Sequence, residues 1–387
     1  MNRRDMMCKT AAAGAALGLL RLARNEGAEP AVAASLSGRS SALDPTDRRQ
    51  TRDPMAVQKA TLVVDGLDTS VITERYVGML RTGGVNCIYR SMGVLQDFAD
   101  QLNFMDAHAK DLALVRNIKE IRQAHQDGKI GVIMGWQSAT GLGVEQLNPF
   151  SGPPRTPLRA YYAMGLRVLG IAYNIANQFG AGNMEPNLGL TRTGRKLVEE
   201  IHHLNILLDV GGHTGEQTSL DAIAMTSGRP VICSHTNIAA IADNPRNVSD
   251  RVIDAIAKTG GVIGITPVND FHVRTKKDMA VAHSPRIRIE KMLDQYEYLK
   301  KRVGVDHIGI GTDFVEGRRI DYDVVNRSST INREIISDGP WLYVQGFETI
   351  ADLPNVTRGL IQRGWPTADI HKVLGGNWLR VYERVWG

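Results

Sequence analysis

The chain has 387 residues, of which 43% are hydrophobic and 22% are charged. It therefore holds enough apolar material for one large core or two smaller ones, and global disorder is excluded. The formal net charge is +5, but the first 33 residues carry five Lys or Arg against three acids, which leaves about +3 for the remainder. This excess is too small to indicate nucleic acid binding, so no nucleic-acid partner is expected.

The N-terminus resembles an export signal of the twin-arginine type. Arg3 and Arg4 precede a run of Ala, Gly and Leu that is too short to span a bilayer, and a small-residue cleavage site follows. We expect residues 1–33 to be this signal, residues 34–58 a polar linker and residues 59–387 a single domain. The mature protein is then periplasmic or secreted. The alternative is a basic amphipathic start to a cytoplasmic protein.

The expected mature chain contains two cysteines, Cys87 and Cys233. Both lie within apolar runs, which favours two buried free thiols over a disulfide. A metal site built from cysteines is therefore not expected.

Eight short runs rich in β-branched residues follow one another from residue 61 onward, separated by longer segments of helical periodicity such as residues 105–125. This alternation is typical of βα units, and eight of them predict an α/β fold of the (β/α)₈ TIM-barrel type. An open doubly wound sheet is the alternative, but no Gly-rich phosphate turn follows the first run. The runs are residues 61–66, 85–90, 130–136, 166–173, 205–210, 230–235, 261–267 and 307–314.

Polar side chains stand at or just after the end of each run. In a (β/α)₈ barrel the carboxyl ends of the strands converge on the active site, so these residues are the first candidates for chemistry. They are Asp68, Arg90, Gln137, Tyr173, His213, His235, Asn269 and Asp313.

Two of these candidates, His213 and His235, follow neighbouring runs, and Asp313 follows the last one. Neutral imidazole is the commonest zinc ligand, and a carboxylate supplies either an oxygen ligand or a general base. The three residues together therefore predict a metal-assisted hydrolytic site.

The order of motifs resembles that of the membrane (renal) dipeptidase family of the amidohydrolase superfamily, over nearly the whole mature chain. The matching pieces are MGLRVLGIAYN, LTRTGRKLVEEIHHLNILLDV, RPVICSHTNIAAIADNPRNV, GVDHIGIGTDF and LGGNWLRV. The resemblance implies a (β/α)₈ barrel and a two-zinc hydrolase that cleaves dipeptides with a water activated between the metals.

The same resemblance implies roles for four residues. His213 and His235 match the two histidine ligands of one metal, and Asp313 matches the aspartate of strand eight that handles the proton. Arg246 matches the arginine that binds the substrate carboxylate, a natural bidentate partner for guanidinium. The alternative for Arg246 is a surface ion pair with Asp243 or a nearby acid.

The chain departs from the family pattern where the second metal would bind. The DGHND motif of the first strand is DGLDT here, so Leu67 and Thr69 replace two metal ligands. Gln137 replaces the bridging glutamate, Tyr173 replaces a histidine that contacts the substrate, and the segment DVGGH before His213 is one residue longer than usual. Without these anionic ligands the mutual repulsion of two cations is not offset, so at most one metal is expected.

The leading hypothesis is a dipeptidase-like hydrolase with at most one divalent metal, zinc being the expected one. His213 and His235 bind it with help from Gln137 or Asp313, while Arg246, Tyr173 and Gln137 contact a small amide or ester substrate that carries a carboxylate. A metal-free enzyme that uses Asp313, His213, His235 and Tyr173 for lyase or isomerase chemistry is the second hypothesis, and a non-catalytic ligand binder is the third. Barrels of this type often form homodimers, and residues 315–345 are expected to act as a lid or as inert surface.

Overall fold

The structure, a computed structural model, describes residues 52–142, 157–273, 284–317 and 342–387. The expected signal, most of the expected linker and most of the 315–345 segment lie outside these residues. None of the helices within the described ranges is long and apolar enough to cross a membrane.

Parallel strands form the centre of the fold, and each of the eight predicted runs overlaps one of them. β1, β2, β4, β5 and β6 pair in this order, with β3 added on β4, and β7, β8 and β9 form a second set. The strands are β1 (Val64–Asp68), β2 (Cys87–Met92), β3 (Leu112–Leu114), β4 (Ile130–Trp136), β5 (Leu166–Gly170), β6 (Leu207–Asp209), β7 (Cys233–Thr236), β8 (Ile263–Ile265) and β9 (Ile308–Ile310).

Hydrogen bonds at two seams join these sets into a closed barrel. Between β6 and β7, the Val210 amide donates to the Ile232 carbonyl at 2.8 Å and the Ile232 amide donates to the Leu208 carbonyl at 3.0 Å. Beyond β9, the Asp313 amide donates to the Leu67 carbonyl at 3.0 Å. The predicted (β/α)₈ barrel is therefore confirmed, and the open doubly wound sheet is wrong.

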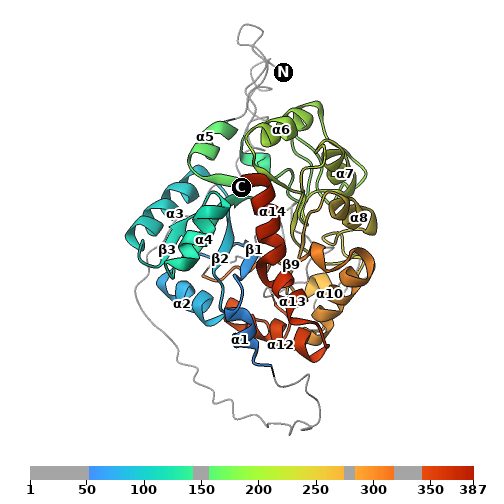
Figure 1. The fold of residues 1–387 in the computed structure, drawn as a ribbon. Helices are drawn as coiled ribbons and strands as arrows, with labels where there is room; N and C mark the ends of the chain where they lie inside the picture. Colours follow the sequence, from blue (N-terminus) through green and yellow to red (C-terminus); the bar gives the residue numbers. More distant parts are fainter. Residues whose placement is uncertain (1–51, 143–156, 274–283, 318–341) are drawn as a thin grey trace, which may run out of the picture. The chain divides into compact units, whose positions relative to one another are not determined.

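Helices form a ring outside the strands (Figure 1). Apolar residues at helical spacing bury one side of helices such as α4 and α6 against the strands, whereas α1 and α12 pack on other helices. The helices are α1 (Pro54–Lys59), α2 (Glu74–Thr82), α3 (Leu95–Ala107), α4 (Ile118–Gln126), α5 (Leu158–Ala163), α6 (Arg192–His203), α7 (Glu216–Ala224), α8 (Asp250–Lys258), α9 (Asp270–Val273), α10 (Ile289–Val303), α12 (Pro354–Gln362), α13 (Thr367–His371) and α14 (Asn377–Trp386).

The single helix predicted over residues 105–125 is wrong. α3 ends at Ala107, residues 112–114 form β3 against β4, and α4 begins only after Asn117. The Asn117 side chain accepts from the Glu120 amide at 2.9 Å and so caps a new helix. Asn followed three residues later by Glu is the sequence signal that marked this second start.

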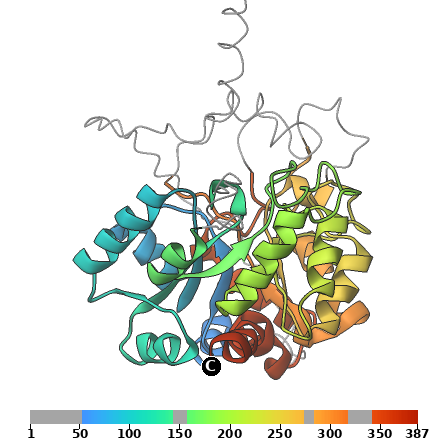
Figure 2. The same cartoon turned by 90° about the horizontal axis from the view of Figure 1, so that it is seen from above.

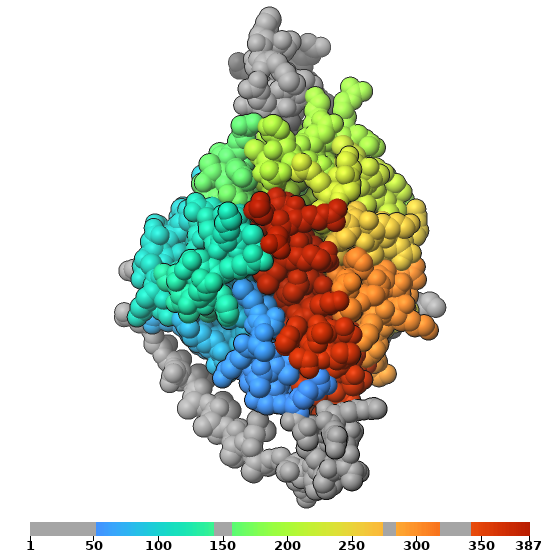
Figure 3. All heavy atoms as spheres, in the orientation of Figure 1, coloured from blue at the N-terminus to red at the C-terminus, as the bar shows by residue number. Residues whose placement is uncertain are grey.

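α14 lies across the amino ends of the strands, as the views of Figures 1 and 2 show. Trp378 and Tyr382 of this helix pack on Val64, Ile232 and Val262, which stand at or near the starts of their strands. Figure 3 shows α14 and its neighbours α12 and α13 as a band down the middle of this face of the molecule. Because one end of the barrel is closed, the chemistry of the barrel is confined to the opposite, carboxyl end.

The barrel begins earlier than the boundary expected from the sequence. α1 lies within the segment assigned to the linker, and its Val57 is buried in the main core. Arg52, just before α1, donates to the Thr367 hydroxyl at 2.6 Å and to the Trp365 carbonyl at 3.0 Å. These contacts attach the residues after position 51 to α12 and α13.

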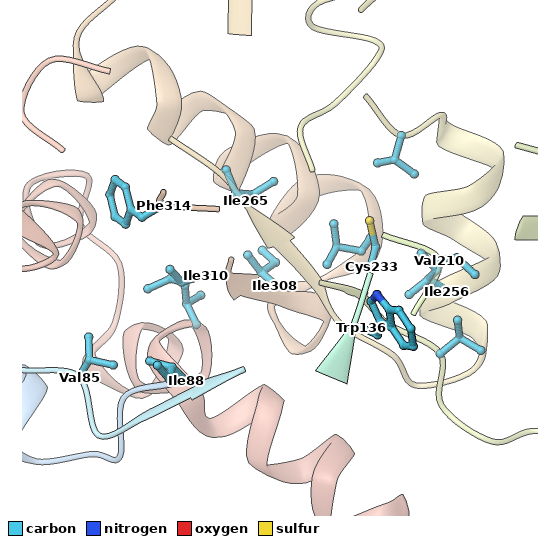
Figure 4. Packing of buried hydrophobic residues seen from close by; sticks show 14 of the residues in the cluster. Val85, Ile88, Trp136, Val210, Cys233, Ile256, Ile265, Ile308, Ile310 and Phe314 are labelled. Carbon is cyan, nitrogen blue, oxygen red and sulfur yellow. The ribbon is translucent and has the colours of Figure 1, made fainter. Parts of the chain in front are cut away.

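The main core lies between the strands and the surrounding helices. Figure 4 shows Ile265, Ile308 and Ile310 of β8 and β9, together with Cys233 of β7, among its buried apolar side chains. Cys87 and Cys233 are both buried and unbridged, which confirms the prediction of two free thiols.

Candidate active site at the carboxyl ends of the strands

Three side chains from β6 and β7 form a chain of short hydrogen bonds. The Ser234 hydroxyl donates to Asp209 Oδ2 at 2.5 Å and accepts from His235 Nδ1 at 2.7 Å. Asp209 Oδ1 also accepts from the amides of Gly211 and Ser234. This network assigns the proton of His235 to Nδ1 and leaves a lone pair on Nε2.

His235 Nε2 has no hydrogen-bond partner among the described residues, although His235 is completely buried. A buried polar atom without a partner is unfavourable by about 1–3 kcal/mol, and such atoms in folded proteins commonly mark a site for a ligand or a reaction. His235 therefore presents an unused acceptor at the carboxyl end of the barrel.

His213, by contrast, uses both of its ring nitrogens. Nδ1 bonds to Asn174 Oδ1 at 2.8 Å, and Nε2 accepts from Arg246 Nη2 at 3.2 Å. The Tyr173 ring stacks on the imidazole, with ring centroids 3.7 Å apart, and the ring of His235 lies at 5.1 Å. The two predicted histidines are thus neighbours, as expected, but they differ in what their nitrogens can still bind.

Arg246 is buried in the site, with 1% of its surface exposed. Besides His213, its guanidinium contacts the His235 carbonyl at 3.4 Å and lies over the Phe271 ring, whereas its Nε has no partner among the described residues. The alternative of a surface ion pair is therefore wrong. Gly212 makes room for this guanidinium, because a Cβ at residue 212 would lie 1.3 Å from Nη1.

Burial sets the charge of these groups. It lowers the pKa of both His213 and His235 well below the usual histidine value, and the positive charge of Arg246 lowers the pKa of each further. Burial also lowers the pKa of Arg246, while Asp313 is the largest influence in the opposite direction. At neutral pH the site thus contains two neutral imidazoles and one guanidinium cation stabilised by the Asp313 carboxylate.

The end of β1 is occupied by apolar packing and by internal hydrogen bonds. Leu67 is fully buried in an apolar cluster, and the Thr69 hydroxyl donates to the Phe314 carbonyl at 2.7 Å. Asp68 accepts from the Tyr76 hydroxyl and from the Ser70 amide. Asp65 accepts from the Thr312 amide at 2.9 Å, so it binds backbone.

Gln137, Tyr173 and Asp313 also stand at the carboxyl end. Gln137 Oε1 is a second buried acceptor that lacks a partner in the described part of the chain. Tyr173 stacks on His213, and Asp313 has a positive φ of 54°, a backbone conformation that is rare for residues other than Gly. The predicted site residues therefore lie on one end of the barrel.

The residues do not fit the two-metal centre of the implied family. Leu67 has no donor atom, Thr69 is bonded to backbone, and the lone pair of His213 Nε2 is taken by a cation. Within the described ranges no group of three or more His, Cys, Asp or Glu is arranged to hold a metal ion. Of the predicted ligands, His235 Nε2 and Gln137 Oε1 are the acceptors without a partner among the described residues, and two are fewer than the three protein ligands usual for catalytic zinc.

A cavity of about 310 Å³ adjoins the site. Gly212, Thr214, Asp243 and Arg246 are among the residues that line it, but His235 and Asp313 are not. Arg246 therefore contacts the His213 imidazole and also lines a ligand-sized space.

Two further strand-end candidates have structural contacts. Asn269 accepts from the Ile287 amide and donates to the Pro285 carbonyl, so it holds a neighbouring segment. Arg90 is buried beside Asp68 and donates to the Ser91 carbonyl.

Sequence reasoning missed four residues of the site: Asn174, Asp209, Gly212 and Ser234. Asp209 was the one with a clear signal, since a carboxylate inside the apolar run NILLDV needs buried donors. Within the segment DVGGH, Gly212 has a φ of 42°.

Known proteins resemble this chain in sequence. A sequence profile of the family described as membrane dipeptidase (peptidase family M19) matches residues 91–386. Dipeptidase tcpJ of Claviceps purpurea is 27% identical over 284 residues, which are 73% of this chain and 57% of that protein. The chain thus spans little more than half the length of this curated relative.

Solved structures share the fold. An amidohydrolase from Pseudomonas aeruginosa is 27% identical, with 87% of this chain and all of that chain covered and a TM-score of 0.75. A metallo peptidase from Rhodobacter sphaeroides, solved with a phosphinate mimic of the dipeptide L-Ala-D-Ala, is 21% identical over 84% of this chain and all of its own, with a TM-score of 0.66.

Proposed function

Because the chain belongs to the membrane dipeptidase family, we propose that it hydrolyses small, dipeptide-like amides or esters at the carboxyl end of its barrel. The observation that carries this proposal is His235, whose Nδ1 is held by Ser234 and whose buried Nε2 has no partner among the described residues. Such a nitrogen is positioned to accept a proton or to bind a metal, the two tasks that hydrolysis requires.

The proposed substrate carries a carboxylate. The Arg246 Nε lacks a partner within the described ranges and retains an N–H for an anion, and the guanidinium borders the cavity.

At most one divalent ion, with zinc the expected one, belongs to this proposal. His235 Nε2 and Gln137 Oε1 would hold it, because both are buried acceptors that no described residue engages. When bound, such an ion supplies Lewis-acid polarisation of the carbonyl and lowers the pKa of a bound water. The chain's own contribution is to orient His235 through Ser234 and Asp209 and to fix a positive charge beside it.

A substrate panel tests the proposal. Dipeptides, N-acyl amino acids and amino acid esters are incubated with the mature chain, alongside analogues whose carboxylate is amidated. We expect the wild type to turn over the carboxylate-bearing members and His235→Gln to lose that turnover. The control His307→Gln should keep it, because His307 lies at the amino end of β9, away from the site. Equal turnover by wild type and His235→Gln would overturn the proposal.

A metal-free enzyme that carries out elimination or isomerisation is the second candidate function. The observation that favours it is the Arg246–His213 hydrogen bond, which replaces a metal contact by a fixed cation. Full turnover of a panel member after exhaustive chelation, with a product other than the hydrolytic pair, distinguishes it from the first candidate. If Asp313→Asn leaves every measurable effect of the protein unchanged, the third reading, a non-catalytic binder, is favoured.

The proposed location is outside the cytoplasm, by twin-arginine export. Substituting Lys for both Arg3 and Arg4 is expected to retain the protein in the cytoplasmic fraction. The proposed assembly is a homodimer, which light scattering of the purified protein checks.

A further inference from the structure

We propose that the guanidinium of Arg246, and not a metal ion, is the permanent partner of His213 Nε2, so that His213 is not a metal ligand in this chain. Arg246 Nη2 lies 3.2 Å from that nitrogen, and the other ring nitrogen is bonded to Asn174. An imidazole with both nitrogens engaged has no lone pair left for zinc.

The backbone is built to accept the guanidinium at this place. Gly212 has a φ of 42°, which side-chain-bearing residues adopt rarely, and a Cβ there would lie 1.3 Å from Nη1 and 2.1 Å from Cζ of Arg246. Any residue with a side chain at position 212 would displace the guanidinium. The longer DVGGH segment therefore provides the space that Arg246 occupies.

Arg246 is also held from its backbone outward. Its amide donates to Asn244 Oδ1 at 2.9 Å, its carbonyl accepts from the Thr236 hydroxyl at 3.3 Å, and Phe271 lies under the guanidinium. Moving the side chain away from His213 would give up contacts that the buried charge needs. The guanidinium is thus a fixed part of the site.

Charge gives the second reason. A divalent ion on His213 would lie beside a buried cation, and in a site of low polarity this repulsion is screened little. Leu67, Thr69 and Gln137 stand where the family resemblance implies anionic or imidazole ligands. Their neutral side chains agree with a site whose positive charge comes from arginine. This inference rests on the proposed function and deepens it. Its test measures zinc binding and needs no substrate, so the inference can be tested even if no substrate is found.

Zinc binding by folded protein is the test. Wild type is compared with Arg246→Met, which keeps the apolar stem, and with Gly212→Asn, since Asn tolerates a positive φ while its Cβ displaces the guanidinium. Arg251→Met is the matched control, because Arg251 follows the same loop and pairs with Glu216 on the cavity rim. Bound zinc per chain and the dissociation constant are measured with inorganic zinc alone, and far-UV circular dichroism confirms folding.

We expect the first two variants to bind zinc about tenfold more tightly or better than wild type, and to lose this gain when His213→Ala is added. We expect Arg251→Met to behave as wild type. In the wild type, we expect added zinc to leave the imidazole ¹⁵N resonances of His213 unshifted. We expect the same result if zinc binds at His235. Two results would overturn the proposal. One is zinc that binds to the wild type and is lost in His213→Ala. The other is folded Arg246→Met and Gly212→Asn proteins that bind no more zinc than the control.

Discussion

The ends of β1 and of β6–β7 lie on the same rim of the barrel but differ in how their polar atoms are bonded. At β1, Asp65, Asp68 and Thr69 make their hydrogen bonds to neighbouring protein groups, and Leu67 is packed in an apolar cluster. At β6–β7, the buried Nε2 atom of His235 has no hydrogen-bond partner among the described residues.

This difference shows that one side of the rim serves stability and the other serves ligands. Residues whose polar atoms all have internal partners cannot bind a ligand without breaking those bonds, whereas an unused acceptor can bind one at no such cost. Substitutions at β1 should therefore change folding, and substitutions at β6–β7 should change function.

The largest expected effect is that of His235→Gln on turnover. Removing the oriented imidazole should lower kcat/KM for the substrate by about a thousandfold or more, since positioned acid–base groups contribute about 10²–10⁴-fold. The melting temperature should fall only modestly, because the side-chain hydrogen bond lost is that of Nδ1 to Ser234, whereas Nε2 makes none to a described residue. Steady-state kinetics and calorimetry on one preparation check both parts, and a large loss of stability with retained turnover would contradict the division.

On the other side of the rim, Asp65→Ala should reduce the free energy of unfolding by about 3 kcal/mol. It leaves the Leu67 amide, the Thr312 amide and the Thr312 hydroxyl without their acceptor. Urea unfolding measures the change. Asp65→Asn retains one carbonyl oxygen and should lose clearly less, so equal losses in the two variants would show that these bonds are not what Asp65 contributes.

Most of the fold was predictable from the sequence because strand-forming runs and helical periodicity are local signals. The exception, residues 105–125, combined apolar residues at helical spacing with a cap at Asn117 that divides the segment, and a strand of three residues gives little periodicity to detect.

The site was predictable in its location but not in its bonding. Strand ends identified His213 and His235 as neighbours, yet their different hydrogen bonds depend on Asn174, Ser234 and Arg246, which lie up to 39 residues away in the sequence. The periodicity of the sequence does not indicate which imidazole nitrogen such a partner binds. Ser234 directly precedes His235, and strand alternation would place the two side chains on opposite faces, although they are bonded in the structure.

A pH experiment extends the comparison, because the buried Asp65 of β1 and a buried histidine beyond β8 respond in opposite directions. Burial lowers the pKa of His272, which follows β8, to about 4, from 6.5 in its absence. As the pH falls from 6.5 to 4, the unfolded chain gains a proton that folded His272 rejects, so stability is lost over this window, by up to about 3 kcal/mol at pH 4. For Asp65, whose pKa is raised by burial, the contribution to stability is present at low pH and lost as the pH rises.

Urea unfolding of wild type and His272→Gln at several pH values separates these contributions. The variant retains a donor for the Thr266 carbonyl, which His272 Nε2 bonds at 2.9 Å. Its stability should fall less steeply than that of wild type between pH 6.5 and 4. Parallel curves would mean that His272 is not the group whose protonation destabilises the fold.

The smallest expected effect is that of Thr69→Val, which probes whether the end of β1 retains any ligand role. The substitution keeps the shape and removes one hydrogen bond, from the Thr69 hydroxyl to the Phe314 carbonyl. Unfolding free energy should fall by about 1 kcal/mol, and turnover should stay within about twofold of wild type. Since the resemblance implies a metal ligand at this position, a large loss of turnover with little loss of stability would mean that the hydroxyl contacts a ligand. The division of the rim into a structural and a functional side would then be wrong at Thr69.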